Sequence, residues 1–139
     1  VGLKSSCDEW FVAAWLKFPE GDAELALARI KALLERRIAT QPLHQPNAGS
    51  VFRNPSGDHA ARLIEQAGLK GFELAGARVP EIHANFVVHP GNAASASAIE
   101  MLIGRVQAEV AEKFGVSLVR EVRILGARNG QSGMYGEGA

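Results

Sequence analysis

The sequence predicts an α+β fold in which a small mixed sheet packs against two to three helices. Three segments carry apolar residues at helical spacing, and the runs between them are short, β-branched or aromatic and bounded by turn residues. The chain has 139 residues, of which 47% are apolar and 22% charged. This length and composition are ordinary for a globular protein with a buried core.

The N-terminal part of the chain predicts a strand followed by a helix. Residues 9–18 are aromatic and β-branched, and Pro19 and Gly21 end the run, as at a strand that enters a turn. Asp22 can cap the next segment, whose apolar stripe predicts a helix that ends near Arg36 and Arg37. Residues 40–46 contain two prolines and form an extended connector, where a domain boundary can lie.

The central part alternates short apolar runs with turn residues. Val51–Phe52 predicts a short strand. Residues 56–58 offer N-caps for a helix that contains residues 61–67 and that Gly68 ends at its C′ position. Residues 70–79 contain three glycines between apolar residues, which indicates short strands or a bulged hairpin. Residues 85–89 read as a buried strand that Pro90 ends.

The longest helix is expected from about Ser95 to Phe114. Its apolar residues keep one face, and Gly115 closes it. Residues 116–125 predict the last strand, with alternating apolar and charged side chains. Residues 127–139 carry no periodic apolar pattern and are expected to form a flexible tail.

Charge and cysteine content narrow the class of protein. Fifteen cations balance fifteen anions, so nucleic acid and membrane surfaces are not expected as partners. The single Cys7 excludes an internal disulfide, and the four histidines have no spacing typical of a metal site. No apolar run approaches the roughly 20 residues of a membrane span, and no signal peptide opens the chain. We therefore expect a cytoplasmic protein.

The segment Asn47-Ala48-Gly49-Ser50-Val51-Phe52-Arg53-Asn54-Pro55 combines a tight turn, a short strand and polar side chains at both ends. Gly49 permits the turn and a close approach by a ligand, because it has no Cβ atom. The segment resembles the serine-bearing segment of the UDP-N-acetylenolpyruvoylglucosamine reductases. From the residues alone, Ser50 as a proton donor and Ser50 as a turn residue are both open.

Four further segments extend this resemblance in the same order. They are residues 61–71, 83–88, 91–93 and 118–126. The resemblance as a whole covers about residues 9–126. The resemblance is to the shorter variant of the family, which lacks an inserted tyrosine-bearing loop. Five segments in register make coincidence an unsatisfactory explanation.

The resemblance implies a flavin-dependent reduction of a vinyl ether. FAD takes hydride from NADPH, and UDP-N-acetylglucosamine enolpyruvate becomes UDP-N-acetylmuramate, a precursor in peptidoglycan biosynthesis. Ser50 matches the proton donor of the family, and Glu121 matches its acidic catalytic residue. Glu121 then donates a hydrogen bond to the developing enolate or belongs to the proton relay. Gly49 and Ser50 are expected near the flavin ring.

Three further residues are candidates for binding the substrate. Arg123 can hold a carboxylate with its planar fork of donors, and it shares a strand face with Glu121; a surface ion pair is the alternative. Asn54 can bind substrate or cap the turn before Pro55, and His83 can contact substrate or form a local hydrogen bond. A shared site requires these residues to line one concavity.

The resemblance also implies how the chain is divided. Residues 1–40 match the last strand and helix of a flavin-binding domain, and residues 41–126 match the C-terminal substrate-binding domain. The region that holds most of the FAD has no counterpart here, and no G-x-G-x-x-G follows a strand. The isolated chain is therefore expected to be inactive, and the complete enzyme to be a monomer. The exposed strand at residues 10–18 can cause self-association. The alternative is a non-catalytic module that binds a nucleotide sugar or another anion.

Overall fold

A computed structural model describes residues 12–92 and 94–125. These residues divide into two units between Leu34 and Glu35, and each unit is described by itself. The helices and strands are, in chain order, α1 (Ala23–Thr40), α2 (Ala60–Gln66), β1 (Glu73–Leu74), β2 (Ala77–Arg78), a 3₁₀ turn at Pro90–Asn92, and α3 (Ala96–Phe114). Helices combined with a small antiparallel sheet confirm the α+β class.

Helix α1 begins where the sequence predicts. The Asp22 carboxylate accepts hydrogen bonds from the backbone N–H groups of Glu24 and Leu25, at 2.8 and 3.1 Å. The helix continues to Thr40, one turn beyond the predicted end at Arg37. The added turn is exposed, and the Thr40 hydroxyl donates a hydrogen bond to a backbone carbonyl one turn earlier in the helix, at 2.8 Å.

The strand predicted at residues 9–18 is wrong at residues 12–18, which have no regular secondary structure. Residues 9–11 lie outside the described part of the chain. A strand requires a hydrogen-bonded neighbour, and no described segment pairs with residues 12–18. Residues 12–18 therefore do not form the exposed strand edge through which self-association was expected.

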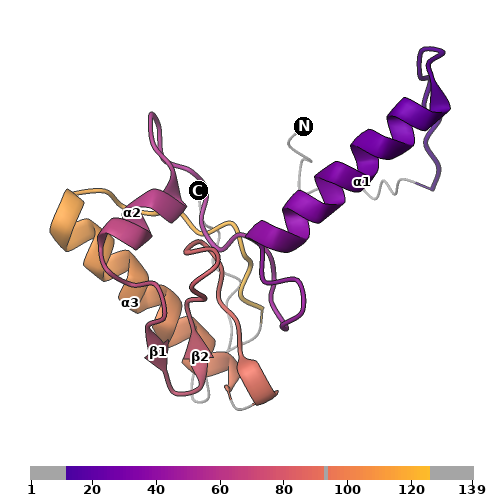
Figure 1. Ribbon diagram of the computed structural model, residues 1–139. Helices are drawn as coiled ribbons and strands as arrows, with labels where there is room; N and C mark the ends of the chain where they lie inside the picture. The colour runs from indigo at the N-terminus through magenta and orange to yellow at the C-terminus, as the bar shows by residue number, and fades with distance from the viewer. Residues whose placement is uncertain (1–11, 93, 126–139) are drawn as a thin grey trace. The chain divides into compact units, whose positions relative to one another are not determined.

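The core of the second unit lies between α2, α3 and the hairpin β1–β2 (Figure 1). Helix α3 contacts both α2 and the two strands. Its buried face consists of five residues at helical spacing: Ala98, Leu102, Ile103, Val106 and Val110. The apolar stripe read from the sequence is thus the face that packs into the core.

Both ends of α3 follow local signals. The Ser95 side chain accepts a hydrogen bond from the backbone N–H of Ala98 at 3.1 Å, which caps the N-terminus. Gly115 has a φ of 67°, in the left-handed region that glycine adopts without strain. The predicted bounds of this helix are confirmed to within one residue.

The hairpin predicted at residues 70–79 is also confirmed. Strands β1 and β2 are antiparallel, with Glu73 opposite Arg78 and Leu74 opposite Ala77. The two residues between them, Ala75 and Gly76, have φ values of 49° and 84°. Positive φ at both central positions is the geometry of a two-residue hairpin turn.

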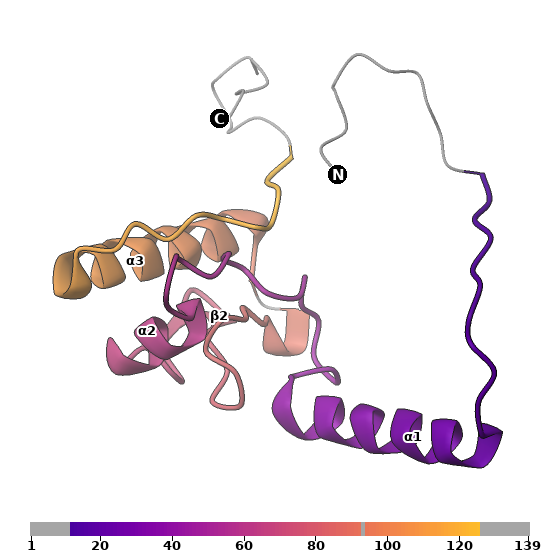
Figure 2. The ribbon, with the colours of Figure 1, turned by 90° about the horizontal axis from the view of Figure 1, so that it is seen from above.

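The other predicted strands are reduced to isolated bridges. Phe52 forms an antiparallel bridge with Arg120, and Val88 forms one with Arg78. The segment that follows α3 runs back along the helix (Figure 2), and the Gln107 side chain donates a hydrogen bond to the Leu118 carbonyl at 2.8 Å. Pairings of one residue each do not build a ladder, so the sheet is smaller than predicted, and its described pairings are antiparallel.

Candidate functional site

The turn at Gly49 presents Ser50 at the surface. Gly49 has a φ of 81°, and its N–H donates a hydrogen bond to the Asn47 side chain at 2.9 Å. Ser50 is exposed, whereas Val51, which follows it, is 3% exposed. The buried Val51 anchors the turn, so the Ser50 hydroxyl is held at the edge of the core.

The segment of Ser50 is hydrogen-bonded to the segment of Glu121. The Val51 carbonyl accepts the N–H of Glu121 at 2.8 Å, and the N–H of Arg53 donates to the carbonyl of Val119 at 2.9 Å. Glu121 is exposed, as Ser50 is. Two residues far apart in the sequence therefore lie on adjacent backbone segments.

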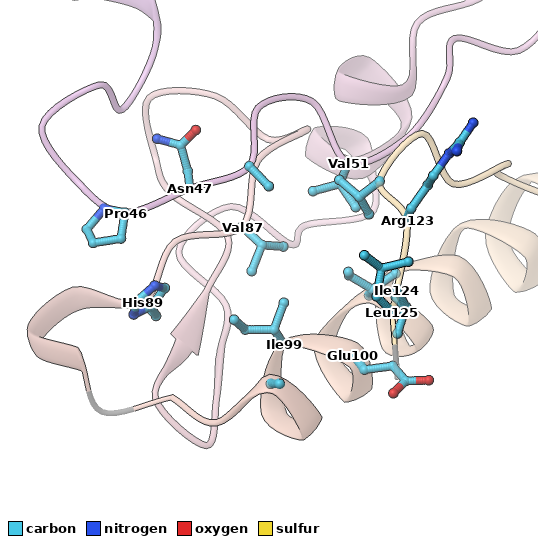
Figure 3. A pocket seen from close by; sticks show the side chains of 14 residues that line it. Pro46, Asn47, Val51, Val87, His89, Ile99, Glu100, Arg123, Ile124 and Leu125 are labelled. Atoms are coloured by element: carbon cyan, nitrogen blue, oxygen red, sulfur yellow. The ribbon is translucent and has the colours of Figure 1, made fainter. Parts of the chain in front are cut away.

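A pocket of about 470 Å³ opens beside this pairing (Figure 3). Its wall is mostly apolar, with polar groups from Asn47, His89, Glu100 and Arg123. Arg123 is the one predicted site residue that lines it; Val51 and Val122, which follow Ser50 and Glu121, also do. The complete lining is Pro46, Asn47, Ala48, Val51, Val87, His89, Ala96, Ile99, Glu100, Ile103, Val122, Arg123, Ile124 and Leu125.

The expectation that all five candidates line one concavity does not hold for this pocket, because Ser50, Asn54, His83 and Glu121 are not in its wall. The Asn54 side chain accepts the backbone N–H of Ala60 at 3.1 Å and so caps α2. This takes the place of the cap expected from residues 56–58, since His59 at the N-cap position makes no side-chain cap. Asn54 thus makes a local hydrogen bond, at the start of α2 and not in the turn before Pro55.

His83 also has a local role. Its Nδ1 accepts the backbone N–H of Asn85 at 3.2 Å, and its ring meets the Phe86 ring edge-on with centroids 4.7 Å apart. The ring is half-buried. Burial, with a smaller contribution from the charge of Lys70, lowers the pKa of His83 below its usual value of 6.5.

This lowered pKa predicts a pH dependence of stability. Below pH 6.5 the unfolded chain binds a proton at His83 more readily than the folded chain does, so the free energy of unfolding should fall as the pH falls through that value. Above pH 6.5 His83 is neutral in both states and does not lower the free energy of unfolding. When the free energy of unfolding from denaturant titrations is plotted against pH, the wild type and His83→Gln should therefore diverge below that pH. Parallel curves would contradict the effect of burial.

Two residues of structural interest were not predicted as site residues. Asn85 is buried, and its side chain forms hydrogen bonds with the backbone of Phe52. His89 lines the pocket, and its Nδ1 is buried without a hydrogen-bond partner among the described residues (Figure 3). An amide at the start of an apolar run is the signal that could have identified Asn85, because a buried amide must bond to something.

The described helix N-termini are already capped and do not offer the usual site for the pyrophosphate of a dinucleotide cofactor. Such a group binds to free N–H groups at a helix N-terminus. Side chains of this chain already accept N–H groups there: Asp22 at α1, Asn54 at α2 and Ser95 at α3.

In the described residues, no cluster of three or more His, Cys, Asp or Glu side chains is arranged to hold a metal ion. None of the described helices is long and apolar enough to cross a bilayer.

Comparisons with known proteins relate the chain to one family. The sequence profile of the C-terminal domain of UDP-N-acetylenolpyruvoylglucosamine reductase matches residues 41–125. The reductase of Alkalilimnicola ehrlichii is 58% identical over 118 residues, and that of Thiobacillus denitrificans is 52% identical over 128 residues. These alignments cover 85% and 92% of this chain, and 39% of each relative. The crystal structure of the Thermus caldophilus reductase superimposes with a TM-score of 0.59 at 33% identity, covering 77% of this chain and 37% of that one.

The fold and the matched profile are those of a C-terminal domain found in a class of oxidoreductases. The chain belongs to the UDP-N-acetylenolpyruvoylglucosamine reductase family, as the sequence resemblance indicated. It spans about two fifths of the length of the relatives that it matches.

Proposed function

We propose that this chain is the C-terminal part of an FAD-dependent reductase that uses NADPH to convert UDP-N-acetylglucosamine enolpyruvate into UDP-N-acetylmuramate. The observation that carries the proposal is the hydrogen bond between Val51 and Glu121, which joins the segments of the two candidate catalytic residues. Family membership supports the same reaction. Peptidoglycan biosynthesis, and through it cell wall formation, cell shape and division in the cytoplasm of a bacterium, is then the context of the complete protein.

Reduction of the enolpyruvyl double bond adds a hydride equivalent to one carbon and a proton to the other. We assign two tasks to this chain: delivery of the proton, and stabilisation of the negative charge that develops on the enolate. Ser50 donates the proton to the carbon beside the carboxylate. Glu121 hydrogen-bonds to the enolate or relays the proton. The guanidinium of Arg123 at the pocket holds the substrate carboxylate.

The remainder of the protein holds the flavin and accepts NADPH in this proposal. The capped helix N-termini of the described residues support this division, because they leave no phosphate site of the usual kind. Gly49 and Ser50 would then be the residues of this chain that lie near the flavin ring. The 139-residue chain by itself should bind no flavin and should not oxidise NADPH.

Substitution of Glu121 in the full-length protein tests the proposal. A hydrogen bond to a charged group contributes about 1.5–3 kcal/mol, so Glu121→Ala should lower kcat by roughly 10- to 100-fold. Glu121→Gln should retain most of kcat if Glu121 donates a hydrogen bond, and lose as much as Ala if it relays a proton. Mass spectrometry of the product, which gains two hydrogen atoms, follows the reaction.

Glu112→Ala is the matched control, because Glu112 is an exposed carboxylate on α3 outside the pocket wall. It should leave kcat unchanged. A wild-type kcat for Glu121→Ala would refute the role of Glu121. Absence of product from the wild-type protein would refute the proposed reaction.

A further inference from the structure

Asn85 is a buried amide next to the segment that bears Ser50. Asn85 is 4% exposed, and it is the one polar or charged residue that is buried in the described part of the chain. Apolar residues surround it in sequence, with Ala84 before it and Phe86 after it, both buried. A polar group in such a place must be hydrogen-bonded, and its partners indicate what it holds.

Both ends of the Asn85 carboxamide bond to one residue, Phe52. The Phe52 N–H donates to Oδ1 at 2.9 Å, and Nδ2 donates to the Phe52 carbonyl at 2.8 Å. The backbone carbonyl of Asn85 also accepts the N–H of Val51, at 2.9 Å. Asn85 therefore makes three hydrogen bonds to the two residues that follow Ser50.

The antiparallel pairing explains why Phe52 needs this side chain. On the edge that faces residues 119–121, the bonds are made by the Arg53 N–H and the Val51 carbonyl. In this pattern the N–H and carbonyl of Phe52, which lies opposite Arg120, point to the other edge. No backbone strand occupies that edge in the described residues, and the Asn85 amide takes its place.

We propose that Asn85 is a positioning residue for the catalytic pair: it holds Val51 and Phe52 on one edge, so that the Val51 carbonyl on the other edge keeps Glu121 beside Ser50. This inference rests on the proposed function of Ser50 and Glu121. Asn85 acts through the backbone of the Ser50 segment. Its loss should therefore reduce the catalytic step more than the affinity for substrate.

Asn85→Asp in the full-length protein tests this role, because the carboxylate has nearly the shape of the amide. It can accept the Phe52 N–H but cannot donate to the Phe52 carbonyl until it is protonated. At mildly alkaline pH, kcat should fall roughly 10-fold, below the roughly 10² that a 1 Å misplacement can cause, while KM stays close to that of the wild type. As the pH is lowered, the ratio of variant to wild-type kcat should recover.

The ratio to the wild type is taken at each pH because other titratable groups lie nearby. His83 accepts the backbone N–H of Asn85, and Glu121 lies across the Ser50 segment. Wild type and variant share both groups, so the ratio removes the part of their titration that is common to the two proteins. Assays are run below the unfolding temperature of each variant, so that kcat refers to folded protein.

Gln66→Glu is the matched control. The Gln66 amide is an exposed group on α2 that accepts a hydrogen bond from Arg62 of the same helix, and among the described residues it makes no hydrogen bond to the Ser50 or Glu121 segments. It should leave kcat unchanged. A folded Asn85→Asp with wild-type kcat, or a loss that does not recover on acidification, would overturn the positioning role.

Amide hydrogen exchange provides a readout that does not depend on the reaction. In Asn85→Asp at mildly alkaline pH, the N–H groups of Val51 and Glu121 should exchange faster, while those in the middle of α3 keep their protection. Unchanged exchange at Val51 and Glu121 would refute the inference even if the wild-type protein proved not to reduce the enolpyruvyl substrate. Inactivity of the wild type with faster exchange in the variant would refute the proposed function alone.

Discussion

Replacing Leu102 with alanine is expected to lower the free energy of unfolding by about 2–5 kcal/mol. Leu102 lies in the middle of α3 and is completely buried. It belongs to the same core cluster as Ile64 of α2 and Ala77 of β2. Removing its side chain leaves a cavity between helix and hairpin, and the neighbours that lose contacts come from several elements. Equilibrium unfolding by denaturant, followed by circular dichroism, measures the loss.

Met101→Ala is the control for this experiment. Met101 precedes Leu102 on α3, but its side chain is 54% exposed, so its truncation should change the unfolding free energy by roughly 0.5 kcal/mol or less. The difference between the two variants isolates burial from helix propensity. Equal losses for Leu102→Ala and Met101→Ala would show that α3 does not present this face to the core.

The helices of this domain could be predicted from the sequence because their ends are local. Ser95 and Gly115 bound α3 within one residue of the prediction, and Asp22 begins α1 as expected. Each of these signals acts on backbone groups no more than a turn away. The hairpin turn at Ala75 and Gly76 is local in the same sense.

The strands could not be predicted in the same way, because a strand exists only through its neighbours. Val51–Phe52 and residues 116–125 have strand-like composition, but their described pairing is limited to the contacts around Phe52 and Arg120. A pattern of alternating side chains indicates a compatible backbone and leaves open what it pairs with. Residues 12–18 show the extreme case, with strand-like composition and no strand.

The candidate site was likewise predicted in part from the sequence. The proximity of the Ser50 and Glu121 segments was an expectation from resemblance, and the hydrogen bond from Glu121 to Val51 agrees with it. The roles of Asn54 and His83 could not be chosen from composition, since a polar residue beside a turn serves a backbone group or a ligand equally well. Their bonds to Ala60 and Asn85 favour the local roles.

Ser50→Ala in the full-length protein should lower kcat for the enolpyruvyl substrate by about 10² or more, the scale of general acid catalysis. KM should change little, because the lost interaction matters chiefly in the transition state. Ser50→Cys should recover part of the loss, since a thiol is a stronger acid and can still deliver a proton. Steady-state kinetics with purified substrate measures all three proteins.

Two controls separate proton donation from general damage. Ser56→Ala removes another exposed serine hydroxyl, in the loop before α2, and should keep the wild-type kcat. Oxidation of NADPH by an artificial electron acceptor needs no proton on the substrate carbon, so it should proceed at the wild-type rate in Ser50→Ala. The positive φ of Gly49 and the buried Val51 keep the turn in place without the hydroxyl. If Ser50→Ala turns over at the wild-type rate, Ser50 is a turn residue, and the proton must come from another group.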